Sequence, residues 1–417
     1  MIKVIFLFTL FLIPLFSFSQ EQERITPNLK ISNDFKDQFD QLDITLYYLY
    51  GSKSKGWRDS CLQPFSGLDN WNAQNVWGTW YFPYVEGGVT KRWQFQNGNN
   101  TPKITELNWA RIIRLPRKSI DSLSPCEKAD IYFGNKDFRI TKHEMFWRGK
   151  LRGQGETRLL ITSTESHEGF CNGARAAGAI LPEPKNSVIL KSLADTNIVI
   201  TFFPLDIKML ATMSYFHMDA NMNQMIGGVV NGTDYSVNAG TFDIALRSVI
   251  GSKGMAFFMD ADPSPGVATN VSIIGYKRTK NYVSITQEEK AKYPNAYNKV
   301  TVNTIIYYLG EISESDAKNT TTEVIRNHSN YVDSLECRYN LYIENGTNNI
   351  MDGVWVNNSY VPDNIWFANG YGSDEVFSFA SPISQPNKWD DNRQLRLGNP
   401  YLPGVFVYNL TYRSAGR

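Results

Sequence analysis

Cys171 has the sequence surroundings of a reactive thiol. It lies in Gly169-Phe170-Cys171-Asn172-Gly173, and the small-residue run that follows, residues 174–181, predicts a tightly packed helix. A cysteine at a helix N-terminus meets the helix dipole and unpaired backbone N–H groups, which lower the thiol pKa from about 8.5 and can hold an oxyanion. The segment therefore predicts a nucleophilic thiolate, with a buried packing cysteine as the alternative.

A thiol nucleophile needs a base, and the chain has four histidines to offer: His143, His167, His217 and His328. His167 lies four residues before Cys171, which makes it a local candidate. Catalytic Cys and His more often come from distant segments, so a structural role is the alternative for each histidine. The sequence has no HExxH, paired CxxC, P-loop or Gly-rich dinucleotide motif, so it predicts neither a metal nor a cofactor.

Helical patterns come first along the chain and strand patterns follow. Ser124 before Pro125 predicts a helix N-terminus, and residues 204–217 carry apolar side chains at helical spacing behind Pro204. β-Branched and aromatic runs bounded by Gly, Asn or Pro predict strands at residues 241–246, 255–259, 271–276, 300–309, 339–343 and 353–356. This order predicts an α+β fold with an antiparallel sheet.

The N-terminus has the pattern of a cleaved signal peptide. Lys3 precedes an apolar stretch, residues 4–18, that ends in Ser17-Phe18-Ser19-Gln20. The stretch is shorter than the roughly 20 residues of a membrane-spanning helix. We therefore expect residues 1–19 to be removed, the protein to be secreted or otherwise extracytoplasmic, and no membrane anchor.

The composition limits the classes of partner. The chain of 417 residues has 42 basic and 41 acidic side chains, so its charge gives no reason to expect nucleic acid binding. Cys61, Cys126, Cys171 and Cys337 are too few and too scattered for a disulfide scaffold, and their pairing stays open.

Residues 20–70 are predicted to form an N-terminal extension with a helix at 35–50. Residues 71–93 are predicted to form a packed loop with short strands.

Several blocks of the sequence resemble the transglutaminase elicitor family, named for an oomycete cell-wall transglutaminase that plants detect. The first blocks are similar to the family's YWP…G…RW and LSPxEKxD…GDxxFxLT segments. The matching residues are Trp80-Tyr81-Phe82-Pro83, Gly87-Gly88, Arg92-Trp93, and Leu123-Ser124-Pro125-Cys126-Glu127-Lys128-Ala129-Asp130 with Gly134, Phe138 and Thr141.

Later blocks continue the resemblance in the same order. The segment around Cys171 through Leu181-Pro182-Glu183-Pro184 is similar to the family's G-L-C-H-G-W-A-P…EP nucleophile segment. The blocks PxDIKAL, NAGTFH, GGEW and HPDFxW are similar to residues 204–208, 238–242, 353–355 and 362–366, and Phe258-Met259-Asp260 is similar to the start of the segment that leads to V-W-N-Q-P. The resemblance covers roughly residues 75–370.

The resemblance implies a papain-like core at about residues 120–370, within a transglutaminase-elicitor-like domain of residues 71–417. In such a core a helix carrying the cysteine packs on an antiparallel sheet. The implied reaction is an aminoacyl transfer in which the thiolate attacks a glutamine carboxamide, ammonia leaves, and a lysine amine resolves the thioester. On this sequence the nucleophile is Cys171 and the residue that orients the base is Asp260.

The sequence departs from the family pattern at the base and along the substrate cleft. Where the family has a histidine after NAGTF, this chain has Asp243, and a carboxylate with a pKa near 4 takes up no thiol proton near pH 7. The family's CHGWAP is replaced by CNGARA, which places Asn172 and Arg175 in the predicted substrate-binding wall. V-W-N-Q-P is absent around residues 263–270.

Three functions follow from these features. The first is a secreted transglutaminase-like aminoacyltransferase, of the protein-glutamine gamma-glutamyltransferase type, in which His167 or another histidine acts with Cys171. The second is an inactive pseudoenzyme whose cleft binds a protein or glycan. The third is a divalent cation site formed by Asp243, Asp260 and Cys171, because two facing carboxylates repel unless a proton or cation lies between them. A protein substrate or ligand is the expected partner.

Overall fold

A computed structural model gives the structure of the chain and describes residues 38, 40–42, 76–94, 101–147, 169–216, 225–230, 233–252, 254–261, 269–345, 349–368, 399 and 401–417. All of these residues belong to one unit, Ile31–Arg417. The predicted signal peptide lies outside the described residues, as do Cys61 and most of the predicted N-terminal extension. Of the helix predicted at 35–50, residues 38 and 40–42 are described, and they are helical.

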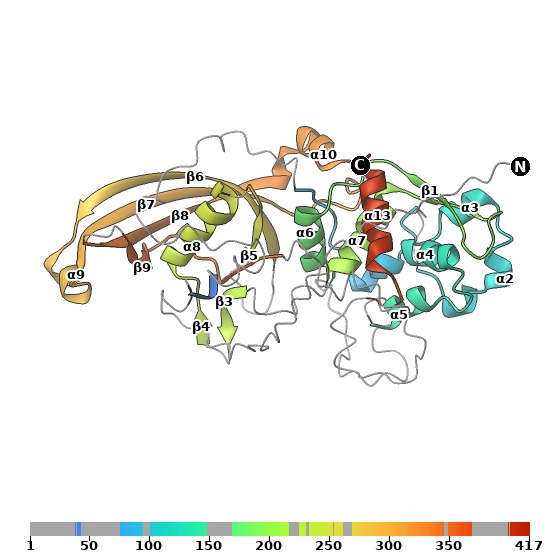
Figure 1. The fold of residues 1–417 in the computed structure, drawn as a ribbon, viewed down its shortest axis with the longest axis horizontal. Helices are drawn as coiled ribbons and strands as arrows, with labels where there is room; N and C mark the ends of the chain where they lie inside the picture. The colour runs from blue at the N-terminus through green and yellow to red at the C-terminus, as the bar shows by residue number, and fades with distance from the viewer. Residues whose placement is uncertain are drawn as a thin grey trace, which may run out of the picture. The chain divides into compact units, whose positions relative to one another are not determined.

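The first half of the described chain forms a helical layer (Figure 1). Its helices and one antiparallel hairpin share a core of aromatic and aliphatic side chains, among them Phe170, Leu210 and Phe406. The C-terminal helix joins this layer and packs on α7. The elements are α2(Trp109–Ile112), α3(Arg117–Asp121), α4(Pro125–Phe133), α5(Arg139–Trp147), α6(Cys171–Ile180), β1(Val188–Lys191), β2(Val199–Phe202), α7(Pro204–Tyr215) and α13(Gly404–Ser414).

The second half forms an antiparallel sheet of eight strands in the order β4-β3-β10-β5-β6-β7-β8-β9. Helix α8 packs against β8 and β9 and continues into a π-helix, Leu246–Ser252, and α6 contacts β6 (Figure 1). The elements are β3(Met225–Val230), β4(Thr233–Tyr235), α8(Ala239–Ala245), β5(Phe257–Asp260), β6(Asn270–Ser284), α9(Gln287–Lys292), β7(Ala296–Leu309), α10(Thr321–Asn327), β8(Val332–Glu344), β9(Ile350–Trp355) and β10(Asn364–Trp366). The predicted α+β class, with the cysteine-bearing helix packed on an antiparallel sheet, is therefore confirmed.

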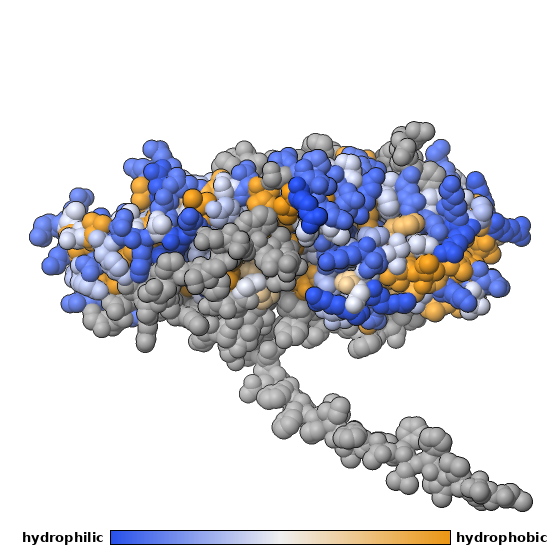
Figure 2. All heavy atoms as spheres, turned by 90° about the horizontal axis from the view of Figure 1, so that it is seen from above, coloured by the Kyte–Doolittle hydropathy of each residue, from blue (hydrophilic) through white to orange (hydrophobic). Residues whose placement is uncertain are grey.

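Five of the six predicted strands are present, and four of them, β6, β7, β8 and β9, are longer than predicted. β6, β7 and β8 pair over almost their whole length, up to Ser284 paired with Asn298. Their apolar runs supply buried side chains to the core that also contains Phe242 of α8. The far end of β6 carries exposed side chains, among them Lys277 and Tyr282. Figure 2 shows mainly hydrophilic residues, with scattered apolar ones, at the end of the molecule that carries α9.

The strand predicted at residues 241–246 is wrong, because this segment is helix α8. Asn238 caps the helix: its Oδ1 accepts a hydrogen bond from the Gly240 N–H at 2.8 Å. Phe242, Ala245, Leu246 and Val249 are all buried at helical spacing, and this spacing outweighs the β-branched residues. In residues 76–94, part of the predicted packed loop, the structure has two short 3₁₀ turns, Tyr84–Glu86 and Gly88–Thr90, in place of short strands.

The predicted helix start at Ser124 is confirmed in detail. Ser124 is the N-cap of α4, Pro125 is its first residue, and Ser124 and Glu127 form a reciprocal capping box. The Glu127 carboxylate also receives two hydrogen bonds from Arg92, at 2.6 and 2.9 Å. This charge-assisted, bidentate interaction joins Arg92 in the loop to the first turn of α4.

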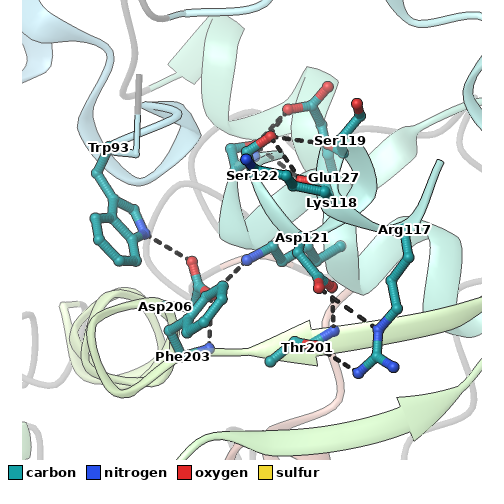
Figure 3. A network of polar contacts seen from close by, with 12 residues as sticks. Trp93, Arg117, Lys118, Ser119, Asp121, Ser122, Glu127, Thr201, Phe203 and Asp206 are labelled. Atoms are coloured by element: carbon teal, nitrogen blue, oxygen red, sulfur yellow. Dashed lines mark hydrogen bonds and ion pairs between the residues drawn. The ribbon is translucent and has the colours of Figure 1, made fainter. Parts of the chain in front are cut away.

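Asp206 and Lys128 form a buried ion pair that joins α7 to α4. Lys128 Nζ lies 2.6 Å from Asp206 Oδ2, and both side chains are fully buried. The Trp93 indole N–H donates to the other carboxylate oxygen at 2.7 Å, and the Phe203 N–H donates to Oδ2 at 2.8 Å (Figure 3). Burial raises the pKa of Asp206, and these donors oppose the rise. The resemblance blocks around Trp93, Lys128 and Asp206 therefore meet in one structural network of the helical layer.

Small residues allow α6 to lie directly on its neighbours. A Cβ added at Gly173 would stand 2.2 Å from the Thr212 carbonyl oxygen on α7, and one at Gly178 would stand 2.1 Å from the Trp77 carbonyl oxygen. The Trp77 N–H donates to the Gly178 carbonyl at 2.9 Å. The small-residue run after Cys171 therefore serves close backbone packing, as the sequence predicts, and this packing fixes where α6 presents Cys171.

Candidate functional site around Cys171

Cys171 is the first residue of α6, and its side chain is partly exposed. Phe170 precedes the helix and is held in place because its N–H donates to the Tyr81 carbonyl at 2.6 Å. The Cys171 thiol donates to Asn172 Oδ1 at 3.3 Å. The predicted position of Cys171 at a helix N-terminus is thus present, with Asn172 beside it.

Asn270 is the side chain that the sheet brings to the Cys171 sulfur. It begins β6, and its Nδ2 lies 3.8 Å from Cys171 Sγ and also donates to Asn172 Oδ1. Its Oδ1 accepts from the Trp366 indole N–H at 2.6 Å. Trp366 is in turn stacked on Phe258, with ring centroids 4.1 Å apart. Residues from α6, β6 and β10 therefore meet in one polar cluster.

The Trp366 contact fixes which way the Asn270 amide faces. An indole N–H can only donate, so its partner must be the amide oxygen, which leaves the amide NH₂ facing the sulfur. An amide nitrogen has no basic lone pair, so Asn270 can donate to the sulfur but cannot take its proton. Asn270 thus stands beside the Cys171 sulfur as a neutral donor.

Arg175 lies one turn after Cys171 and links α6 to the sheet. Its Nε donates to the Asn270 carbonyl at 3.0 Å, and its Nη1 donates to the Gly310 carbonyl, just beyond β7, at 3.2 Å. Burial lowers the pKa of Arg175, and the negative charges of Glu311 and of an ionised Cys171 oppose this. A guanidinium remains charged in proteins, so Arg175 places a fixed cation beneath the site.

Asp260 and Asn270 are partners in the β5–β6 pairing, directly across from one another. Asp260 Oδ1 accepts from the Thr269 N–H at 2.8 Å, and its carbonyl accepts from the Tyr360 hydroxyl at 2.8 Å. Asp260, predicted to orient the base, therefore lies on the strand next to Asn270, which faces Cys171. A base-orienting role for it stays a prediction.

Asp243, predicted to stand at the base position, lies on α8 against the sheet. Its carboxylate accepts from Arg278 Nε at 2.7 Å, from Arg247 Nε at 2.8 Å and from the Tyr339 hydroxyl at 2.6 Å. Burial would raise the pKa of Asp243, but the two guanidiniums and the tyrosine reverse this and lower it. The strand predicted at residues 241–246 would have carried Asp243, but the residue lies on α8, whereas Asp260 is on β5 and Asn270 faces the sulfur.

Two of the four histidines, His143 and His328, are among the described residues. His143 is buried on α5, where its Nδ1 lies 3.1 Å from Glu144 Oε1 and its ring faces Tyr401. His328 ends α10, and its ring faces Tyr331. His167, the local candidate for the base, and His217 lie outside the described residues.

The cation hypothesis for Asp243, Asp260 and Cys171 is not supported. Over the described parts of the chain, no group of three or more His, Cys, Asp or Glu side chains is placed to hold a metal ion. The carboxylate of Asp243 is neutralised by arginines instead.

Among the described helices, none is both long and apolar enough to cross a membrane.

Sequence reasoning missed Asn270 and Trp366. Trp366 lies in the Pro362-Asp363-Asn364-Ile365-Trp366 block, and Asn270 directly precedes the apolar run at 271–276 that predicts a strand. The signal for Asn270 was its place at the start of that strand. Its role depends on contacts with residues 96 and 99 positions away in the sequence, which no local pattern reveals.

The chain resembles a solved transglutaminase in fold. The structure matches the crystal structure of the GP42 transglutaminase from Phytophthora sojae with a TM-score of 0.52 and 16% sequence identity, over 90% of this chain and 98% of that one. No family model matches the sequence, and no curated protein matches it. The chain therefore has a transglutaminase-elicitor-like, papain-like α+β fold, as the resemblance of its sequence blocks predicts.

Proposed function

We propose that this chain is an exported protein with a transglutaminase fold that binds a polypeptide at the Cys171 site without transferring a glutaminyl group. The observation that carries the proposal is Asn270, whose amide NH₂ is held toward the Cys171 sulfur by the Trp366 indole. A transferase at this site would need a group that takes the thiol proton and returns it to the leaving ammonia. Asn270 does neither.

The polar groups at the site suit an amide-containing ligand. Asn172 and Asn270 present carboxamides beside the partly exposed Cys171, and a carboxamide both donates and accepts hydrogen bonds. A glutamine side chain or a peptide bond has the complementary pair of groups. We therefore propose a polypeptide as the ligand of this cluster.

Aminoacyl transfer is the second candidate, and Arg175 favours it. The buried guanidinium and the α6 N-terminus are both positive, and together they favour an ionised Cys171. A thiolate held in this way would attack a glutamine carboxamide if another group supplied the proton for the leaving ammonia. Under this alternative His167 is the residue proposed to act with Cys171, and Asp260 the residue proposed to orient it.

Peptide binding tests the first candidate. We expect a glutamine-containing peptide to bind the wild-type chain and Cys171→Ala with dissociation constants within about twofold of one another by calorimetry, because a thiol is a weak hydrogen-bonding group and the proposed ligand contacts are made by carboxamides. Asn270→Ala should weaken binding by roughly tenfold, because the loss of one well-placed hydrogen bond costs about 1 kcal/mol or more.

Asn281→Ala is the matched control, because Asn281 is an exposed asparagine on the same strand, β6. It should bind as the wild-type chain does. Equal affinities of Asn270→Ala and wild type would place the ligand elsewhere. A thioester adduct on Cys171, detected by mass spectrometry in the wild type and absent from Cys171→Ala, would favour the transferase instead.

A further inference from the structure

A cluster of charged and hydroxyl side chains is buried between α8 and the sheet, away from the Cys171 site. Asp243 lies on α8, Arg247 in the π-helix that follows it, Tyr276 and Arg278 on β6, and Tyr339 on β8. The two oxygens of the Asp243 carboxylate receive hydrogen bonds from Arg247, Arg278 and Tyr339 at 2.6 to 2.8 Å. The single carboxylate is thereby fully engaged.

These side chains carry an excess of positive charge. Arg247 and Arg278 each bring one positive charge, because guanidinium groups stay protonated in proteins. Asp243 brings one negative charge, and Tyr276 and Tyr339 are neutral because burial raises both their pKa values, that of Tyr276 to about 12. One buried positive charge is left without a counter-charge within the cluster. Such a charge is costly unless an anion balances it.

Donors in the same cluster also lack hydrogen-bond partners. Arg247 Nη1 has none, and Arg247 Nη2 lies 2.8 Å from Asp243 Oδ2 without a hydrogen-bond geometry to it. The Tyr276 hydroxyl has none either. Both residues are more than nine-tenths buried, with 6% and 3% exposed surface. Tyr276 and Arg278 are two residues apart on β6 and therefore lie on the same face of the sheet, Arg278 and Arg247 contact the same carboxylate of Asp243, and the π-helix that carries Arg247 contacts β6. The open donors of Arg247 and Tyr276 therefore lie in the same region between the π-helix and β6.

We propose that a small monovalent anion of the halide class binds between the Arg247 guanidinium and the Tyr276 hydroxyl. Such an ion would fill the open donors and balance the excess charge in a single step. Arg247 lies in a π-helical turn, Leu246–Ser252, and π-helical turns are frequent at functional sites. The anion would then fasten the π-helix to β6. The inference is independent of what the Cys171 site does.

Chloride dependence of unfolding tests the inference. We expect the full chain to melt roughly 2 °C or more higher in sodium chloride than in sodium gluconate at the same ionic strength, because an anion that binds only the folded state stabilises it. Tyr276→Phe, which removes one donor and keeps the ring, should lose most of this difference. Tyr282→Phe on the same strand, where Tyr282 is 51% exposed, should keep it.

Crystals grown in sodium bromide give an independent readout. The inference predicts an anomalous bromide peak in contact with Arg247 and Tyr276, and no such peak in Tyr276→Phe crystals. Equal melting temperatures in the two salts, together with water and no bromide at this place, would overturn it. A chloride effect that Tyr276→Phe keeps in full would also overturn it, because the ion would then bind elsewhere.

Discussion

Replacing Asp243 with asparagine is expected to lower the free energy of unfolding by about 3–5 kcal/mol. The carboxylate is the shared partner of Arg247 and Arg278, and its side chain and that of Arg278 are fully buried. A neutral amide would leave both guanidiniums in the core without their counter-charge. Urea unfolding followed by circular dichroism measures the change.

The pH dependence of that difference gives a second readout. The arginines lower the pKa of Asp243 in the folded chain relative to the unfolded chain, so the unfolded chain binds the proton more readily. The stabilisation by Asp243 is therefore complete above the unfolded pKa of about 3.9 and is lost as pH falls through the lower folded pKa. The difference in the free energy of unfolding between wild type and Asp243→Asn should be constant from neutral pH to about pH 5. It should become smaller in strong acid.

Asp333→Asn is the matched control, because Asp333 is an exposed carboxylate on β8. It should change stability by no more than about 0.5 kcal/mol. If Asp243→Asn were as stable as the wild type while the alkylation rate of Cys171 changed sharply, Asp243 would belong to the thiol site, and its structural role would be wrong.

Gly173→Ala is expected to destabilise the chain by at least about 2 kcal/mol, although alanine is the better helix former. In an open helix the same change would add about 1 kcal/mol of stability. Here the new Cβ would stand 2.2 Å from the Thr212 carbonyl oxygen and 2.8 Å from the Phe216 backbone, so α6 must move away from α7. Cys171 lies two residues earlier and would move with it.

Ala179→Gly on the same helix is the control, because Ala179 is only partly buried. This variant should have a free energy of unfolding about 1 kcal/mol lower than the wild type, from helix propensity alone. The sign of the Gly173→Ala effect in urea unfolding is decisive, since a variant more stable than the wild type would show that α6 has room against α7.

The sequence predicts the elements whose signals are local. Ser124, Pro125 and Glu127 lie within one helical turn, and the structure has the capping box at that place. The helix after Cys171 is likewise predicted from its own small residues. Helices α9 and α10 have the same kind of local signal, because Thr286 with Glu289 and Thr320 with Glu323 form capping boxes. These two signals were available in the sequence and were missed.

Strand length and the identity of α8 depend on what lies across the fold. The outer parts of β6 and β7 are polar, and they remain strands because each pairs with its neighbour through the whole ribbon. Thr241 and Ile244 favour a strand by their branching, but the Asn238 cap and the apolar face that α8 turns to the sheet favour a helix. Tertiary packing decided both cases.

Only the local part of the candidate site could be predicted from the sequence, because its other part depends on tertiary contacts. Cys171 and Asn172 follow from one short segment, whereas the partner of the sulfur is set by the pairing of β5 with β6 and by Trp366 from β10. The family resemblance pointed to position 243, which the structure places on α8. Only the three-dimensional arrangement identifies Asn270 as a side chain that faces the thiol.

Ammonia release tests the central claim most directly. The chain would be incubated with a glutamine-containing peptide and a primary amine, and ammonia release and amine incorporation would be followed for wild type and Cys171→Ala. Because Asn270 cannot take the thiol proton, we expect both proteins to give the same background rate at neutral pH. A wild-type rate well above that of Cys171→Ala, with the amine joined to the peptide, would contradict the account and establish aminoacyl transfer by Cys171.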